Sequence, residues 1–203
     1  KGGHLNSEEQ RGLAAAIAAR PPDNNIPREP VLSDLPAYAR RAIERRGQDP
    51  AWLEQRYRVR WDGDRLYWPA GKGASRRSVW PWESPKTLTV APRGLIGEHL
   101  LAKGARIVVV EGDYKAASIP LPWVGVGLLG DAMSEEQAAT VRATEPVELV
   151  IMLDGGFRRQ AERIVEVLCP VPARVVDLPA GKGPDDVLRG DLFALLGGWS
   201  GQN

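Results

Sequence analysis

The sequence predicts an α/β protein (α+β overall) with two parts: a small, basic, antiparallel β-rich subdomain at residues 34–104 and a domain with a helix-covered, mainly parallel sheet at 105–203. In the first part, apolar and basic residues alternate in short runs between Gly, Pro and Lys, which is typical of antiparallel strands. In the second part, wholly apolar, β-branched runs alternate with helical segments, which is typical of parallel strands covered on both faces. Charge separates the parts too, since the net charge is +6 for the first and −5 for the second.

The first 33 residues are interpreted as a Pro-rich tether with a short helix. An Ala-rich stretch at 7–20 is typical of a helix, and the four prolines that follow it disfavour regular structure. A second helix is predicted at 35–46, because Ser33 or Asp34 can cap its start.

Residues 56–68 predict a basic β-hairpin. Basic and apolar residues alternate at 56–61, an Asp-Gly-Asp turn follows, and an apolar and aromatic strand returns. Further short strands are predicted at 78–82 and 87–91. Five of the seven tryptophans lie in this region, and we interpret them as the core of the β-rich unit, with stacking on single-stranded bases as the alternative. They are Trp52, Trp61, Trp68, Trp80 and Trp82.

The second region reads as strands separated by helices. The strands are predicted at 107–110, 124–128, 149–153 and 174–176. The helices are predicted at 114–118, after a Ser134–Gln137 capping box, at 157–168 and at 184–196.

Acidic residues follow three of these strands. Glu111 follows the first, Asp154 follows the third, and Asp185 and Asp186 follow the fourth after a loop. Parallel strands place such residues at one edge of the sheet, where neighbouring carboxylates repel each other. Mg²⁺ or Mn²⁺ would relieve this repulsion, because both ions prefer oxygen ligands. The alternative is that each acid is a solvated turn or helix-start residue.

The order of these motifs resembles the Toprim domain of bacterial-type and phage primases. Glu-Gly at 111–112, Asp-Gly-Gly at 154–156 and Leu-Pro-Ala-Gly-Lys-Gly-Pro-Asp at 178–185 match, in order, the Glu-Gly, Asp-x-Asp and Leu-Pro-x-Gly-Lys-Asp-Pro-Asp patterns of that family. Residues 38–47 and 84–97 resemble segments of the family's basic subdomain. The resemblance covers about residues 34–190 and implies primer synthesis on single-stranded DNA.

The sequence departs from the family at two acidic positions, which are Gly156 and Gly183 here. Two interpretations stay open. The site works with fewer protein ligands and more water, or the chain is a degenerate, non-catalytic Toprim protein that binds single-stranded DNA or a replication partner. A Toprim nuclease is a third class, but the basic region at 34–104, which small Toprim nucleases lack, argues against it.

The resemblance implies metal-dependent nucleotidyl transfer with Glu111 and Asp154 as catalytic residues. The metal ligands it implies are Glu111, Asp154, Asp185 and Asp186. The residues expected to bind the incoming nucleotide are Lys86, Arg93 and Lys115. For nucleic-acid phosphates we expect contacts from the basic half, where the alternative for each residue is solvated surface. These residues are Lys72, Arg76, Arg77, Arg58 and Arg60.

The implied partners are a single-stranded DNA template, NTPs and a replicative helicase, fused or separate. The family reads its start site through a zinc ribbon upstream of this region, and we expect such a ribbon before Lys1 because the sequence holds one cysteine and two histidines. No apolar run spans a membrane and no secretion leader is visible, so the expected location is the cytoplasm.

Overall fold

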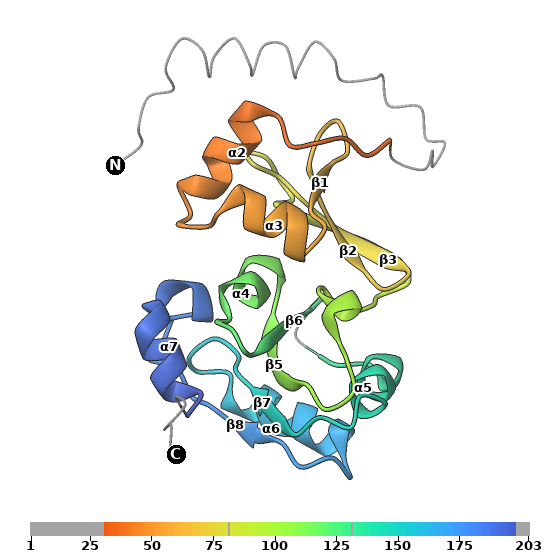
Figure 1. Cartoon of the computed structure of the whole chain (residues 1–203), viewed down its shortest axis with the longest axis vertical. Coiled ribbons are helices and arrows are strands. Elements are labelled where there is room, and N and C mark those ends of the chain that lie inside the picture. Colours follow the sequence, from red (N-terminus) through yellow and green to blue (C-terminus); the bar gives the residue numbers. More distant parts are fainter. Residues whose placement is uncertain (1–30, 81, 131, 198–203) are drawn as a thin grey trace. The chain divides into compact units, whose positions relative to one another are not determined.

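The computed structural model describes residues 31–80, 82–130 and 132–197 (Figure 1). Contacts divide the chain into two compact units. The first contains the described residues up to Trp68 together with Arg76–Leu88, and the second contains Pro69–Ser75 and the described residues from Thr89 onward. The boundary predicted at residue 104 therefore lies inside the second unit, and the predicted tether and helix up to residue 30 lie outside the described residues.

A bridge explains why residues before 104 pack with the second unit. Ile96 forms antiparallel bridges with both Ala70 and Gly127. Leu95, its neighbour, is fully buried in the hydrophobic core of the second unit. Local strand patterning cannot reveal such a pairing, because its partners are distant in the sequence.

Two helices open the first unit, α2 (Ala37–Glu44) and α3 (Pro50–Arg56). Helix α2 confirms the helix predicted at 35–46, although its N-cap is Pro36. Helix α3 was not predicted, and it overlaps the expected basic strand only at Arg56. Its start carries two ordinary signals, since Asp49 accepts a hydrogen bond from the Ala51 amide and Pro50 stands in the first turn.

The predicted hairpin is confirmed in a shorter form, with β1 (Arg60–Trp61) paired antiparallel to β2 (Leu66–Ala70). Asp62 stabilises the turn because its carboxylate accepts the amide hydrogens of Asp64 and Arg65. The next strands are β3 (Gly73–Arg77) and β4 (Thr87–Val90), and the sheet order is β1-β2-β3-β4.

The strand predicted at 78–82 is wrong, because β3 ends at Arg77 and the described residues of that range, 78–80 and 82, are not in a strand. Close packing explains the start of β3: a Cβ atom on Gly73 would lie 1.9 Å from the Pro92 carbonyl oxygen. The tryptophans of this region differ in how far they are buried. Trp61 and Trp68 are buried as expected for a core, whereas Trp82 is 56% exposed.

The second unit contains the predicted parallel sheet, in the order β6-β5-β7-β8. Its strands are β5 (Arg106–Glu111), β6 (Val124–Leu128), β7 (Glu148–Ile151) and β8 (Arg174–Val175). Its helices are α4 (Asp113–Ser118), α5 (Glu135–Arg142), α6 (Arg158–Leu168) and α7 (Arg189–Leu195), with 3₁₀ turns η1 (Glu98–Leu100) and η2 (Pro184–Asp186).

Both faces of this sheet are covered, as the apolar runs predict. Ile107, Val109 and Ile151 pack with α5 and α6 in one hydrophobic core, and the alternate residues Val108 and Val110 are also fully buried. Helix α4 lies so close to β6 that a Cβ on Gly125 would meet the Ala116 carbonyl oxygen at 2.1 Å.

Local signals in this unit are mostly confirmed. Ser134 and Gln137 form the predicted capping box at the start of α5. The single helix predicted at 184–196 is wrong in its continuity, since η2 and α7 are separated by extended backbone at Val187 and Leu188. Within the described residues, no helix is both long and apolar enough to cross a membrane.

Candidate active site

The second unit brings Lys115 and Asp154 together at the carboxyl end of its sheet. The Lys115 ammonium donates a hydrogen bond of 2.6 Å to Asp154 Oδ2. The other oxygen, Oδ1, is buried and has no hydrogen-bond partner. A buried carboxylate oxygen without a partner is unfavourable, so this atom is available to a ligand.

Asp185 joins this pair around Gly183. A Cβ atom on Gly183 would lie 2.9 Å from each of Asp154 Oδ1, Asp185 Oδ1 and the Cε atom of Lys115. The two carboxylate oxygens and the Lys115 side chain therefore crowd the position that a side chain at residue 183 would occupy, so only glycine fits there without moving them. Gly183 has an ordinary φ of −101°, so its role here is room rather than backbone freedom.

The pKa of Asp185 is raised above its ordinary value. Burial of its carboxyl group is the main cause, and the negative charges of Asp186 and Asp154 add to the increase. A backbone hydrogen bond and the positive charge of Lys115 lower the pKa in part. A cation between the two carboxylates would favour the ionised form of Asp185.

The loop after β7 pairs with the loop after β8, and this pairing positions the carboxylates. Gly155 forms a parallel bridge with Ala180 and donates its amide hydrogen to the Lys182 carbonyl oxygen at 2.8 Å. A Cβ on Gly155 would lie 2.0 Å from the Pro179 carbonyl oxygen. Glycine at position 155 therefore allows the close approach that sets Asp154 beside Gly183.

The expected gathering of four carboxylates is not what the structure shows. Asp186 accepts the Gly183 amide hydrogen at 2.9 Å and so caps η2. Glu111 is the last residue of β5, which pairs with β7. Val109 pairs with Ile151, so Glu111, two residues later, lies opposite the residue that precedes Asp154. Across the described parts of the chain, no three His, Cys, Asp or Glu side chains form a group able to hold a metal ion.

Two converging carboxylates still suit a divalent cation. Mg²⁺ in phosphoryl-transfer sites is commonly held by one or two carboxylates, with substrate phosphates and water completing its shell. Asp154 Oδ1, which has no hydrogen-bond partner, and Asp185 Oδ1 are carboxylate oxygens that could serve as such metal ligands. The residues present therefore fit Mg²⁺ or Mn²⁺ with fewer protein ligands than the family pattern implies.

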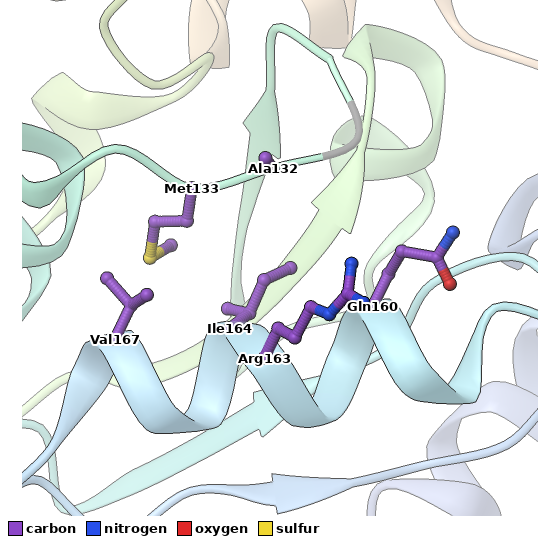
Figure 2. Close-up of a pocket in the computed structure, with 6 residues that line it drawn as sticks. All are labelled: Ala132, Met133, Gln160, Arg163, Ile164 and Val167. Atoms are coloured by element: carbon purple, nitrogen blue, oxygen red, sulfur yellow. The ribbon is translucent and has the colours of Figure 1, made fainter.

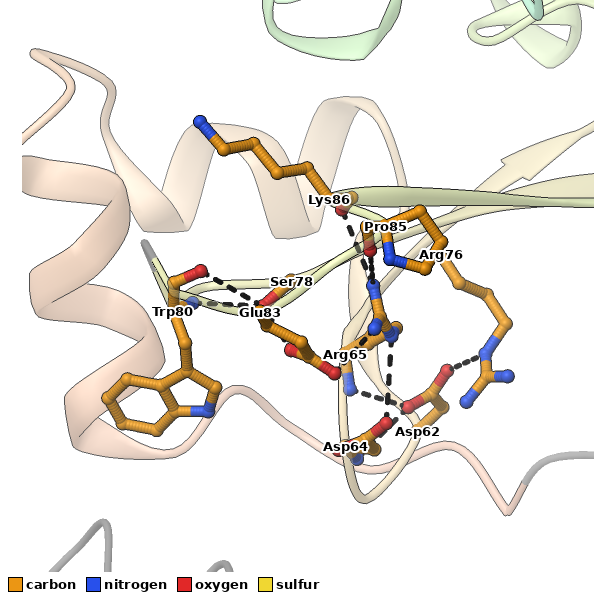
Figure 3. Close-up of polar contacts among 9 residues, drawn as sticks. All are labelled: Asp62, Asp64, Arg65, Arg76, Ser78, Trp80, Glu83, Pro85 and Lys86. Carbon is orange, nitrogen blue, oxygen red and sulfur yellow. Dashed lines mark hydrogen bonds and ion pairs between the residues drawn. The ribbon is translucent and has the colours of Figure 1, made fainter.

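Three predicted phosphate-binding cations are exposed. In the second unit, Lys72 lies in the turn between β2 and β3, and the Arg93 guanidinium lies 3.8 Å from the position of a Cβ on Gly130, just after β6. Lys86 belongs to the first unit, where its side chain points away from the neighbouring polar network (Figure 3).

The other basic candidates are in the first unit. Arg76 forms an ion pair with Asp62, whose hydrogen bond raises the pKa of the guanidinium. Arg60 donates to the carbonyl oxygens of Glu54 and Val59. Arg58 is exposed with a φ of 56°, and Arg77 is half-buried.

Sequence reasoning missed a buried arginine that organises the first unit. Arg65 is only 4% exposed; it forms an ion pair with Glu83 and donates to the Pro85 carbonyl oxygen at 2.8 Å (Figure 3). The Asp-Gly-Asp-Arg turn carried no signal for this role, because the partners of Arg65 are 18 and 20 residues away.

It also missed Asp113, a buried acid at the start of α4. Its carboxylate accepts hydrogen bonds from the Ser75 hydroxyl at 3.2 Å and from the Tyr114 amide. Asp113 therefore ties β3 to the start of α4 within the second unit.

A pocket of about 300 Å³ lies beside α6 (Figure 2). None of the candidate site residues lines it, so it is separate from the carboxylates. Its lining residues are Ala132, Met133, Gln160, Arg163, Ile164 and Val167.

The two sheets and their connections have the fold of a phage-type primase core. The chain is similar to the crystal structure of the primase fragment of the bacteriophage T7 primase-helicase, with a TM-score of 0.59 and 19% identity over 86% of this chain and 81% of that one. It is also similar to a chain in a T7 lagging-strand DNA polymerase complex with primase domains bound to an RNA/DNA hybrid and dTTP, with a TM-score of 0.55 and 20% identity over 79% of this chain and 87% of that one.

Comparison by sequence finds no counterpart. No family model matches the chain, and neither does any curated protein. At 19–20% identity, the structural likeness establishes the fold and leaves the roles of individual residues to argument from their surroundings.

Proposed function

We propose that this chain is the RNA-polymerase part of a primase, which extends RNA on a single-stranded DNA template from NTPs. The observation that carries the proposal is that oxygens of Asp154 and Asp185 both lie next to Gly183, in a chain with a primase fold. Open α/β sheets bind their ligands at this carboxyl edge.

Each residue of this edge has a task in the proposal. Asp154 and Asp185 would hold Mg²⁺ or Mn²⁺ through their carboxylate oxygens, and Glu111 on the adjacent strand would act through the water shell of the ion. The bound cation would neutralise triphosphate charge and lower the pKa of the primer 3′-hydroxyl. Lys115 keeps Asp154 in place, and with Arg93 it supplies positive charge for phosphate oxygens.

A second candidate is a non-catalytic primase-fold protein that binds single-stranded nucleic acid. The observation that favours it is the Lys115–Asp154 ion pair, since the ammonium supplies one positive charge to the carboxylates without any metal. The glycines at 156 and 183 point in the same direction.

Primer extension separates the two candidates. An RNA oligonucleotide annealed to a DNA template is incubated with the chain, labelled NTPs and Mg²⁺ or Mn²⁺, so that no start-site recognition is needed. Template-dependent extension, lost in Glu111→Gln and Asp154→Asn, supports the proposal. The matched controls are Glu162→Gln and Asp34→Asn, exposed acids outside this edge, and both should retain activity.

Two other outcomes of the primer-extension assay would support the alternative functions. Binding of the template without extension at any Mg²⁺ or Mn²⁺ concentration would contradict primer synthesis and leave the non-catalytic protein. A shortened template would instead identify a nuclease.

A further inference from the structure

Three aromatic rings of the first unit form a stack that ends at the surface. Tyr38 and Trp80 stack with centroids 5.4 Å apart and an interplanar angle of 18°, and Trp80 and Trp82 stack at 5.4 Å and 17°. Trp61 packs edge-on against Tyr38 at 5.5 Å. Trp82 ends the stack and is 56% exposed, so one face lies on Trp80 and the other faces solvent.

The turn that carries Trp80 and Trp82 is held from within (Figure 3). The Trp80 amide donates to the Ser78 hydroxyl at 3.0 Å, and the Ser78 hydroxyl also bonds to Glu83. Glu83 in turn forms an ion pair with the buried Arg65. Since these bonds exist before any ligand arrives, the exposed ring loses little conformational freedom on binding.

The net charge of the first unit as a whole suits a polyanion. The nearby acids Glu83, Asp62 and Asp64 all lie within ion-pair distance of an arginine, Arg65 or Arg76. The described residues of the first unit carry eleven lysines and arginines against seven acids, so the surplus is positive. An exposed aromatic face in a cationic unit is the arrangement that proteins use to stack unpaired bases.

We propose that the exposed face of Trp82 is a stacking platform for an unpaired nucleobase of a single-stranded nucleic acid. The nearly parallel rings of Tyr38, Trp80 and Trp82 would extend by one base, while basic residues of the first unit contact the flanking phosphates. The inference deepens the proposed function, because it names where a strand is held, but it does not require catalysis.

The test measures the affinity of the 203-residue chain for a fluorescent single-stranded DNA of about eight nucleotides. Trp82→Ala should weaken binding about tenfold or more, whereas Trp82→Phe should retain most of the affinity. The matched control is Trp52→Ala, which removes a half-buried tryptophan that packs on Arg56 in α3 and should change the affinity less than twofold. Circular dichroism checks that each variant is folded.

An abasic strand of the same length isolates stacking from charge. If Trp82 stacks on a base, wild type and Trp82→Ala should bind the abasic strand equally. An equal loss on both strands would overturn the proposal, as would unchanged binding in Trp82→Ala or a change in oligomeric state, which would mark Trp82 as a protein interface. Repeating the measurement with RNA and with DNA of the same sequence shows which of the two nucleic acids binds to Trp82. Trp82-dependent binding without primer extension would leave this inference standing while the proposed catalysis fails.

Discussion

The Lys115 ammonium lies 2.6 Å from one carboxylate oxygen of Asp154, while the other oxygen of that carboxylate is buried without a partner. Replacing Lys115 by Met should leave Asp154 and Asp185 close together without a positive charge between them. We expect a stability loss of about 1–2 kcal/mol, most of it restored by millimolar Mg²⁺. Thermal unfolding with and without MgCl₂ measures both effects.

Lys103→Met is the matched control, because Lys103 forms an ion pair with the exposed Glu145 on the surface. It should alter neither the unfolding midpoint nor its response to Mg²⁺. If Mg²⁺ stabilises neither wild type nor Lys115→Met, these carboxylates do not form a cation site.

Gly183→Ala should separate the carboxylates without damaging the fold. Its Cβ would lie 2.9 Å from oxygens of Asp154 and Asp185, so these side chains must move. We expect primer extension to fall at least tenfold with a stability change below about 1 kcal/mol, since Gly183 has an ordinary φ. In Gly190→Ala the added Cβ meets nothing within 4 Å, so activity should be unchanged. Full activity in Gly183→Ala would show that this spacing does not matter.

Arg65→Met should destabilise the first unit by about 3 kcal/mol, because it leaves the half-buried Glu83 without its cation. Chemical denaturation followed by tryptophan fluorescence measures the loss. The double variant Arg65→Met/Glu83→Gln should recover part of it, since no charge is then left unpaired. If the double variant is no more stable than the single one, the ion pair is not the cause.

We expect the buried Tyr57 to reduce the stability of the fold at alkaline pH. Burial raises the pKa of its hydroxyl from 10.0 to about 12. Because the folded-state pKa is the higher one, this contribution is complete below pH 10 and is lost as the pH rises toward 12, by about 2–3 kcal/mol at most. Tyr57→Phe should remove this part of the pH dependence, as unfolding measured between pH 9 and about 12 will show. Parallel curves for wild type and variant would refute the assignment.

Features that depend on neighbours in the chain were predictable. The Asp62 turn, the Ser134 capping box and the four apolar strands each have a local signal, and each is present. Helix α3 was predictable too, because Asp49 and Pro50 are ordinary helix-start residues, but the alternation from residue 56 onward suggested extended structure. The true strand β1 is only Arg60–Trp61.

Features that depend on distant partners were not predictable. The local sequence indicates that Arg65 is a hairpin residue, whereas its contacts with Glu83 and Pro85 appear only in the folded structure. Trp82 reads as a core residue, and its exposure follows from the turn that Ser78 and Glu83 hold.

The sequence by itself determined the order of the four parallel strands, the basic and acidic halves, and the acids that follow the strands, because each of these features shows in a local sequence pattern. Only the tertiary structure decided that Asp154 pairs with Lys115 and shares the surroundings of Gly183 with Asp185, while Asp186 caps a turn. The physical reason is that Lys115 and Asp154 are 39 residues apart, and the backbone pairing of Gly155 with Ala180 sets which side chains share the edge of the sheet.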